Sequence, residues 1–318
     1  MPVSSSAPGR ILAGIDVGTL TCRLLIADIS RSGTLREIRS DRRILRLGES
    51  VDRDRLLRPD AMQRVLATLK EWRQVMDDFQ VESSSIVATS AVRDAQNRDD
   101  FVDLVKREAQ VQIDIISGEE EARLTMLGIR SGLPNSMTDL LALDIGGGST
   151  EFILDRRDQP IVARSIDIGV VRLSERILHA DPPTAGEVRQ AREWVRNETA
   201  AVVVGMSLPT GLTFVGTAGT ITSLAAMAQQ LPAYDPARIH NYSLTLDMVK
   251  ALEAEVLSRP KGQRKGLPGL ERGREEVIAA GVIILSTVME TLGMASVLVS
   301  DLGLREGVLI HLANSPEK

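Results

Sequence analysis

The sequence contains very few residues of the kinds that build disulfides, metal centres or Cys- and His-based active sites. It has one cysteine, Cys22, and three histidines, His179, His240 and His311, among 318 residues. A single cysteine excludes a disulfide framework and a cysteine-rich zinc or iron–sulfur site. The histidines lie too far apart for an HExxH-type metal motif, and they offer no convincing Ser-His-Asp set. Catalysis by this chain would therefore rest on carboxylates, arginines and backbone groups.

The sequence also lacks a long hydrophobic run. The longest uncharged apolar stretch, 277–289, contains Ser286 and Thr287 and is followed by Glu290. A membrane-spanning helix needs about 20 apolar residues, so this stretch predicts a buried helix. Residues 1–10 are rich in Ser and Pro and have no apolar core, which is unlike a signal peptide. We therefore expect a soluble, cytoplasmic protein with no membrane partner.

The overall composition is that of an ordinary globular protein. Charged residues make up 25% and hydrophobic residues 43% of the chain, which excludes wholesale disorder. At about 150 residues per domain, the length predicts two domains. The net charge of −5 argues against a protein that coats nucleic acid. Arginine supplies 32 of the 38 basic residues; this bias fits phosphate or carboxylate binding, but genome composition explains it equally well.

The order of apolar patterns predicts an α/β fold in two halves. Short β-rich runs alternate with segments of helical spacing, and a Gly-, Pro- and Ser-containing break at 131–139 separates two such series. We place the domains at 1–135 and 136–304. The expected strands are 10–29 (as a hairpin), 34–47, 85–89, 111–116, 140–144, 151–155, 161–167, 213–215 and 296–299; the expected helices are 60–79, 99–109, 119–130, 171–177, 185–204, 223–230, 246–257, 275–292 and 305–313, with loops at 231–242 and 260–274.

A short motif occurs once in each half. Ile15-Asp-Val-Gly-Thr-Leu-Thr and Leu143-Asp-Ile-Gly-Gly-Gly-Ser both follow a strand and precede another. Asp16 aligns with Asp144, Gly18 with Gly146, and Thr21 lies near the position of Ser149. So short a match can arise by chance, but the strand–helix pattern that follows it also repeats. We therefore favour an internal duplication.

Three glycine-rich turns follow strands, at 16–21, 144–149 and 216–220. Glycines allow backbone N–H groups to approach a phosphate, and hydroxyl side chains add donors. None of the turns is a P-loop or a dinucleotide-binding GxGxxG motif. Asp16 and Asp144 either stabilise their turns or orient water and Mg²⁺, which favours one or two carboxylates together with phosphate oxygens.

Two further motifs carry charged residues next to expected strand ends. In 117–123, Ser117 and Glu120 fit a capping box, which does not account for Glu121; a carboxylate one turn into a helix can act as a general base on water. Arg93, just past a strand, forms either a surface ion pair or a fork on phosphate oxygens. The basic clusters Arg39/Arg42/Arg43/Arg46 and Lys261/Arg264/Lys265/Arg272/Arg274 are typical of solvated faces, and either could alternatively line a path for a polyanion.

Taken together, these motifs resemble the exopolyphosphatase/guanosine-pentaphosphate phosphohydrolase (Ppx/GppA) family over roughly residues 11–312. The motifs begin at Ile15, Thr89, Ile116, Leu143, Gly216 and Ser300. The resemblance implies two duplicated ribonuclease-H-like domains of the actin-like ATPase superfamily, with a cleft between them. It also implies that a last helix, about 305–318, packs on the first domain, and that the protein is a homodimer.

The resemblance further implies Mg²⁺-dependent hydrolysis of a terminal phosphoanhydride bond. Glu121 would be the catalytic base, Arg93 would hold phosphate, and Asp144 and Glu151 would bind Mg²⁺ or orient the water. Such hydrolysis needs charge neutralisation and an aligned water but little covalent chemistry. The implied phosphate-binding residues are Asp16, Gly18, Thr19, Thr21, Gly146, Gly147, Gly148, Ser149, Gly216, Thr217 and Gly219.

The substrate is the open question at this stage. We expect an exopolyphosphatase, with guanosine pentaphosphate as the alternative substrate; a superfamily kinase and a non-catalytic phosphate or nucleotide sensor are less favoured. Leu20 stands where the family usually has an Asn-like residue, which puts one phosphate contact in doubt. The sequence also ends at Lys318, without the helical extension of longer members. This short form motivates the hypothesis of a preference for short polyphosphate or another phosphoanhydride.

Overall fold

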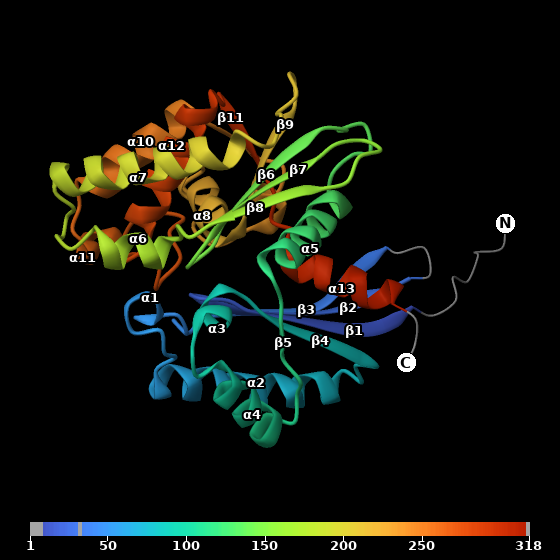
Figure 1. Cartoon of the computed structure of the whole chain (residues 1–318). Helices are drawn as coiled ribbons and strands as arrows, with labels where there is room; N and C mark the ends of the chain where they lie inside the picture. The colour runs from blue at the N-terminus through green and yellow to red at the C-terminus, as the bar shows by residue number, and fades with distance from the viewer. Residues whose placement is uncertain (1–8, 31–33, 316–318) are drawn as a thin grey trace. The chain divides into compact units, whose positions relative to one another are not determined.

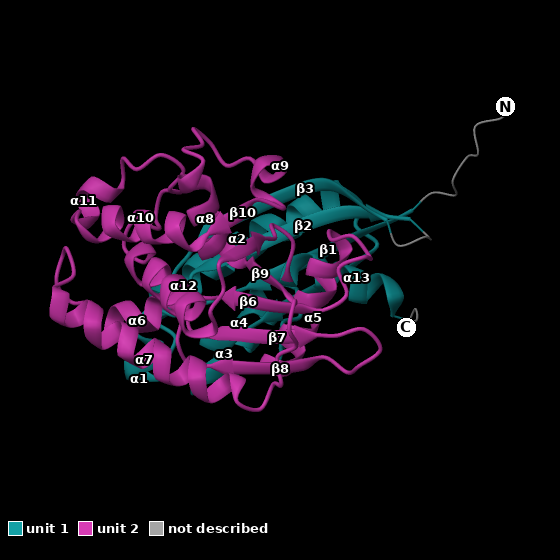
Figure 2. Ribbon diagram, turned by 90° about the horizontal axis from the view of Figure 1, so that it is seen from above, with its two compact units in different colours: residues 1–117, 304–318 teal, residues 118–303 magenta. Residues whose placement is uncertain are grey.

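The computed structural model describes residues 9–30 and 34–315, which divide into two compact units. Unit 1 comprises the chain up to Ser117 together with the segment from Leu304 onward, and unit 2 comprises Gly118–Gly303 (Figure 2). Each unit is built around its own β-sheet. The fold class expected from the sequence, two α/β halves, is confirmed.

The sheet of unit 1 has the strand order β3-β2-β1-β4-β5. β1, β2 and β3 pair antiparallel, whereas β4 pairs parallel with β1 and β5 pairs parallel with β4. This is the ribonuclease-H-like arrangement that the family resemblance implied. The strands are β1 (Arg10–Val17), β2 (Thr21–Ile29), β3 (Leu35–Ile44), β4 (Ser83–Ala88) and β5 (Asp114–Ile115).

Helices cover both faces of the unit 1 sheet (Figure 1). On one face, α2 and α4 close a core that includes Ile15, Leu24 and Trp72. On the other face, α13 packs on β1 and β2, with Leu309 against Leu12 and Leu25. The helices of unit 1 are α1 (Val51–Asp54), α2 (Pro59–Asp78), α3 (Ser90–Asp94), α4 (Arg98–Ala109) and α13 (Leu304–Asn314).

The sheet of unit 2 has the strand order β10-β11-β9-β6-β7-β8. Its strands β6, β7, β8 and β9 are ordered as β1, β2, β3 and β4 are in unit 1. β6, β7 and β8 pair antiparallel, and β9 pairs parallel with β6. The strands are β6 (Leu140–Ile145), β7 (Thr150–Asp155), β8 (Val162–Ile166), β9 (Thr213–Thr217), β10 (Ser243–Thr245) and β11 (Ser296–Val299).

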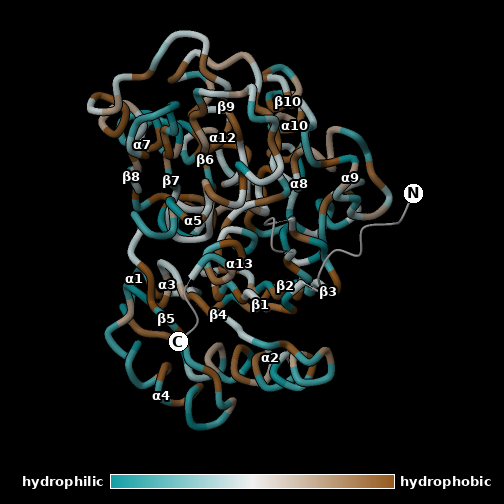
Figure 3. Tube along the Cα trace, turned by 90° about the vertical axis from the view of Figure 1, so that its right-hand side faces the viewer, coloured by the Kyte–Doolittle hydropathy of each residue, from teal (hydrophilic) through white to brown (hydrophobic). Residues whose placement is uncertain are grey.

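One face of this second sheet is covered by α5 and the other by several helices around α12 (Figure 1). Ala122 and Met126 of α5 pack against Ala142 and Ile153. α12 is apolar along nearly its whole length, as Figure 3 shows by colour, and its residues from Ile278 to Met289 are buried. The helices of unit 2 are α5 (Gly118–Ser131), α6 (Val170–Arg176), α7 (Ala185–Val203), α8 (Ala218–Ala228), α9 (Pro236–Ile239), α10 (Leu246–Leu257), α11 (Lys261–Arg264) and α12 (Ile278–Leu292).

Most expected elements are present, but some differ in extent, and α1, α3 and β10 were not expected. The strand expected at 111–116 is only Asp114–Ile115, and α8 begins at Ala218 instead of at residue 223. Short helices, α9 and α11, occur inside the two expected loops. The two units divide after Ser117 and not near residue 135, because α5 packs on β7 and β8 of unit 2. Among the described residues, no helix combines the length and apolarity needed to span a bilayer.

Candidate functional site

A row of polar side chains crosses the sheet of unit 2 near the ends of its strands. Asp144 on β6 lies opposite Glu151 on β7 and beside Thr217 on β9. Glu151 in turn lies opposite Ser165 on β8. Residues at the same register position on neighbouring strands share one face of a sheet. These four residues share the face that α5 covers, because Ala142 and Ile153, two positions away, pack on α5.

The two carboxylates of this row differ in exposure, since Glu151 is buried and Asp144 is half-buried. Glu151 is 1% exposed and accepts a hydrogen bond of 2.8 Å from the Ser165 hydroxyl. Opposed carboxylates on adjacent strands repel one another, and burial makes this repulsion more costly. A cation would stabilise such a pair, so Asp144 and Glu151 suit the role of metal ligands that the family resemblance implied.

The first turn of α5 brings Glu121 to the same face. Gly118, the first residue of α5, lies over β8, since a Cβ added to it would be 3.4 Å from Cβ of Ser165. Glu121, one turn into the helix, is 8% exposed, whereas the two preceding acidic residues are more accessible. Glu120 instead pairs with Arg123 through contacts of 2.7 and 2.8 Å. The sequence singled out Glu121 among three consecutive glutamates, and the structure distinguishes it by burial.

The second glycine turn is fixed by backbone hydrogen bonds. The N–H of Gly146 donates to the carbonyl of Ser149 at 3.0 Å, which closes the turn. The carbonyls of Gly146 and Gly147 accept hydrogen bonds from Val170 and Val171 at the start of α6. Gly148 completes the turn, and Ser149 is buried. The turn is thus positioned from both sides, as a rigid phosphate-binding loop requires.

The third glycine turn, 216–219, passes from β9 directly into α8. The Thr217 hydroxyl donates to the carbonyl of Leu302 at 3.0 Å, so a phosphate contact by this residue would use its backbone N–H. Ala218 adopts a left-handed conformation with φ of 68°. Non-glycine residues in this conformation are strained and tend to occur at functional sites. Gly216 begins this turn as the penultimate residue of β9.

Arg274, which the sequence placed only in a basic cluster, lies beside the third glycine turn. Its guanidinium fills the space beside Gly219, where a Cβ would lie only 2.0 Å from Nη2 of Arg274. Nε of Arg274 donates to Glu271 at 2.8 Å. Arg264 and Arg274 are each 3% exposed, so the interpretation of their cluster as a solvated face is wrong for these two residues. A run of Arg, Lys and Gly gave no local signal of burial, because the burial comes from packing against distant segments.

The first glycine turn, in unit 1, has the same hydrogen bond as its counterpart in unit 2. The N–H of Gly18 donates to the carbonyl of Thr21 at 3.0 Å. The Thr19 side chain is 6% exposed, and its hydroxyl lies 2.9 Å from that of Ser90. Leu20 is also buried, and its carbonyl accepts two backbone hydrogen bonds from the segment after β3. Leu20 therefore contributes to packing of the turn, and its side chain is not a phosphate donor.

Next to this turn, Asp16 on β1 lies opposite Arg23 on β2. Arg23 was not selected from the sequence, and its place directly after the buried Cys22 is the one local signal that it lies on the other face of the strand. Cys22 is buried in the core, as expected, and this burial raises the pKa of its thiol, which disfavours the nucleophilic thiolate. Arg93, at the end of α3, donates to the carbonyl of Ile116 at 3.0 Å, just before the chain leaves unit 1.

The structure therefore gathers the predicted residues into two sets, one in each unit. Unit 2 contributes Glu121, the Asp144–Glu151 pair and the turns at 146–149 and 216–219. Unit 1 contributes the turn at 16–21 and Arg93. In the described part of the chain, no group of three or more His, Cys, Asp or Glu could hold a metal unaided. A Mg²⁺ ion at Asp144 and Glu151 would thus take its remaining ligands from water or substrate oxygens, as this ion commonly does.

Comparison with known proteins gives matches along nearly the whole chain. The description "Ppx/GppA phosphatase family" belongs to a family model that matches residues 25–315. The "Exopolyphosphatase 2" of Mycobacterium tuberculosis is 34% identical over 315 residues, covering 95% of this chain and 98% of that protein.

Solved structures agree with this result. A Ppx/GppA family member from Aquifex aeolicus has a TM-score of 0.82 and 34% identity, covering 97% of this chain and 100% of its own. An exopolyphosphatase from Cytophaga hutchinsonii has a TM-score of 0.86 and 26% identity, covering 97% and 99%. The similarity thus extends over both units.

Proposed function

This chain belongs to the Ppx/GppA phosphatase family, and from that premise we propose that it is a Mg²⁺-dependent exopolyphosphatase that releases the terminal phosphate of inorganic polyphosphate. That it hydrolyses a phosphoanhydride bond follows from its exopolyphosphatase relatives. Its substrate and its metal are our proposals. The observation that supports them best is the row of Asp144, buried Glu151 and Ser165 beside the first turn of α5.

Glu121 is the proposed general base. Its carboxylate would accept a proton from a water molecule whose oxygen attacks the terminal phosphorus. The bridging P–O bond then breaks, and the shortened polyphosphate leaves with the electron pair of that bond. Phosphoryl transfer of this kind depends mainly on alignment and on neutralising charge, so a single well-placed carboxylate is sufficient as base.

The other residues of unit 2 bind and orient the substrate in this proposal. Backbone N–H groups of the turn at 146–149 would hold oxygens of the attacked phosphate. Asp144 and Glu151 would bind Mg²⁺, which when bound neutralises negative charge on the phosphate oxygens. Ser165 fixes the Glu151 carboxylate by its hydrogen bond of 2.8 Å. Arg93 and the unit 1 turn are proposed to contact phosphate as well.

The test is phosphate release by the whole protein in the presence of Mg²⁺. Short polyphosphate, long polyphosphate, guanosine pentaphosphate and ATP are compared as substrates. We expect turnover of polyphosphate and a loss of kcat of at least about 10²-fold in Glu121→Gln, since general-base catalysis contributes about 10²–10⁴-fold. Glu120→Gln is the matched control, because its carboxylate pairs with Arg123 and it should retain activity.

The outcomes separate the alternatives. Preferential turnover of guanosine pentaphosphate would reassign the substrate and leave the chemistry intact. Transfer of phosphate from ATP to an acceptor would replace the hydrolase proposal with a kinase. A folded wild-type protein that binds polyphosphate but releases no phosphate would be a sensor and would contradict the proposal.

A further inference from the structure

A pocket of about 790 Å³ lies on the sheet of unit 1 beside the end of α13. All of its lining residues belong to unit 1 and come from the start of β1, the first half of β4, the segment around β5 and the last turn of α13. Binding sites for small molecules typically have volumes of about 300–1,000 Å³. The pocket therefore has the size of a ligand site, and none of the roles assigned above uses it.

The pocket is distinct from the first glycine turn. It begins at the edge of the sheet where the parallel strands β1 and β4 both start, at Arg10 and Ser83. The turn at 18–21 follows the other end of β1, and the lining of the pocket includes none of residues 16–21. A ligand in this pocket would thus occupy a second site of unit 1.

The register of the strands explains why the lining is polar. Ser83 pairs with Leu12, which Leu309 of α13 covers, so Ser83 lies on the α13 face of the sheet. Ser85 lies on the same face, because side chains two residues apart on a strand point the same way. Asp114 on β5 pairs with β4 two residues beyond Ser85 and shares this face. α13 therefore packs on the apolar part of the face, and the polar part beside it forms the pocket.

Three side chains of this lining are available to a ligand. Within the part of the chain that the structure describes, the hydroxyls of Ser83 and Ser85 and the carboxylate of Asp114 form no hydrogen bond or ion pair. Ser83 and Ser85 are half-buried and Asp114 is exposed. A hydroxyl can donate and accept, whereas a carboxylate only accepts. Strand geometry separates the Cα atoms of Ser85 and Asp114 by about 8 Å, a gap that a sugar ring can bridge.

The charge of the pocket excludes a polyanion as its ligand. Glu82 is already engaged, since it accepts a hydrogen bond of 3.0 Å from the N–H of Ile11 and lies 3.7 Å from Nε of Arg10. Arg10 and Glu82 thus offset one another. With histidine counted as neutral, Asp114 leaves the lining with one net negative charge. Polyphosphate would be repelled here, whereas an uncharged polar molecule would not.

We propose that this pocket binds an uncharged ligand with neighbouring hydroxyl groups, a sugar or a nucleoside. Asp114 would accept hydrogen bonds from two adjacent hydroxyls, as an acidic residue accepts from ribose in dinucleotide-binding folds. Ser83 and Ser85 would exchange hydrogen bonds with further oxygens of the ring. Leu312, which packs against the apolar cluster under α13, would contact the C–H face of the ring. The inference goes beyond the proposed function and does not depend on hydrolysis.

The test is calorimetric titration of the whole protein with adenosine, D-ribose and 2′,3′-dideoxyadenosine. We expect the dideoxy compound, which lacks both adjacent hydroxyls, to bind at least about tenfold more weakly than adenosine. Asp114→Asn should raise the Kd of adenosine about tenfold, because it removes the charge that strengthens these hydrogen bonds. Ser85→Ala should raise it about fivefold. Asp103→Asn is the matched control, since Asp103 is exposed on α4, which covers the other face of the sheet.

The outcomes distinguish the source of the ligand and decide the inference. Ribose that binds at least as tightly as adenosine would identify a free sugar, and tighter binding of adenosine would identify a nucleoside. Failure of both to bind the folded protein would overturn the inference, as would equal Kd values for adenosine and its dideoxy counterpart. Adenosine affinity that is unchanged in both Asp114→Asn and Ser85→Ala would place the binding elsewhere and would also overturn it.

Discussion

The two sheets of this protein each contain a pair of antiparallel strands joined by a glycine turn, and the two turns have the same backbone hydrogen bond. β1 and β2 enclose the first turn as β6 and β7 enclose the second, and Asp16 and Asp144 each stand just before it. Gly18 donates to Thr21, and Gly146 donates to Ser149, both at 3.0 Å. The expected internal duplication is thus visible in hydrogen bonds as well as in sequence.

The two sheets differ in the residues that extend the row from each aspartate. In unit 1 the next two strands contribute Arg23 and Arg42, whereas in unit 2 they contribute Glu151 and Ser165. The unit 1 row is therefore basic and the unit 2 row acidic. The backbone turn is thus the same in both units, whereas the strand residues beside it differ in charge.

Removing the acidic charge of the unit 2 row should have the largest effect. For Glu151→Gln we expect kcat to fall by about 10²-fold or more and the Mg²⁺ requirement to rise, because a neutral amide is a poor ligand for this ion. The amide oxygen can still accept the hydrogen bond from Ser165, so folding should be retained. Ser165→Ala should lower activity by about tenfold, since it only orients the carboxylate. Phosphate release against Mg²⁺ concentration measures both; full activity of Glu151→Gln would refute the acidic assignment.

Adding a methyl group to each turn tests how alike the two copies are. A Cβ at Gly18 would lie 2.9 Å from the carbonyl oxygen of Thr21, and one at Gly146 would lie 3.1 Å from that of Ser149. Alanine should cost about 1–3 kcal/mol of unfolding free energy at either site, with the larger loss at Gly18. Gly205 has nothing within 4 Å, so Gly205→Ala is the control. Urea unfolding gives the values; a neutral Gly18→Ala would show that the turn can relax.

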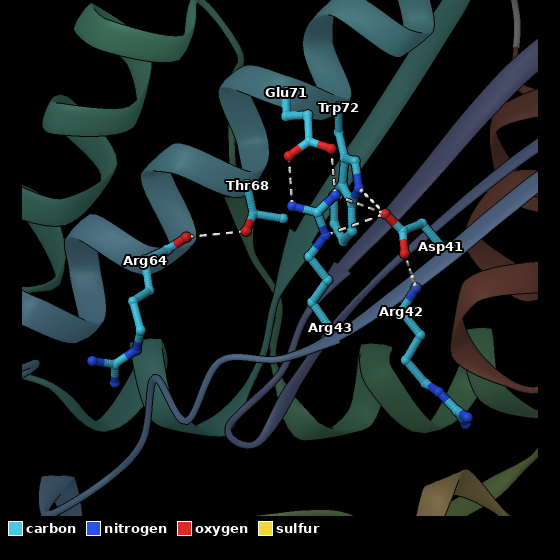
Figure 4. A network of polar contacts seen from close by, with 7 residues as sticks. All are labelled: Asp41, Arg42, Arg43, Arg64, Thr68, Glu71 and Trp72. Carbon is cyan, nitrogen blue, oxygen red and sulfur yellow. Dashed lines mark hydrogen bonds and ion pairs between the residues drawn. The ribbon is translucent and has the colours of Figure 1, made fainter. Parts of the chain in front are cut away.

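The smallest expected effect concerns the network of Asp41, Arg43 and Trp72 that anchors β3 (Figure 4). β8, the corresponding strand of unit 2, has no such residues in its sequence. Burial raises the pKa of Asp41, but hydrogen bonds from Trp72 and Arg43 outweigh it and hold the pKa below its ordinary value of 3.8. A lowered folded-state pKa stabilises the protein above the unfolded pKa, and this stability is lost as the pH falls through the folded value. Asp41→Asn should therefore cost about 1 kcal/mol at pH 7 and progressively less below pH 3.8.

Unfolding measured at several pH values checks this prediction. The control is Asp77→Asn, whose ion pair with Arg73 is on the surface of α2 and should contribute less than about 0.5 kcal/mol. An Asp41→Asn cost that stays constant between pH 7 and pH 3 would contradict the assigned pKa shift. A cost that disappears in acid would show that the carboxylate charge anchors the outer strand of unit 1.

Much of the fold could be predicted from the sequence because its signals are local. The strands that flank each glycine turn, the amphipathic α2 and the apolar α12 all follow from patterns a few residues long. Glu121 was also identifiable, since capping explained its neighbour but not itself. The start of α8 was missed because Gly216 and Gly219 read as a turn, whereas Ala218 already begins the helix.

The remaining features depend on register and on contacts between distant segments. That Ser165 faces Glu151, or that Arg42 faces Arg23, follows from how separate strands align, which no local pattern specifies. Arg274 looked like part of a solvated loop and is instead packed against Gly219. The site roles of Asp16, Thr21 and the other predicted residues stay predictions until the variants above are measured.

The return of the chain to unit 1 at its last helix has a consequence for synthesis. Unit 2 is one continuous segment, Gly118–Gly303, whereas unit 1 is completed only by residues from Leu304 onward. Leu12 and Leu25 emerge from the ribosome early, but Leu309, which covers them, emerges among the last residues. During translation, the face of the first sheet that α13 covers therefore stays uncovered until all of unit 2 has been synthesised. Unit 1, whose synthesis begins first, is completed last.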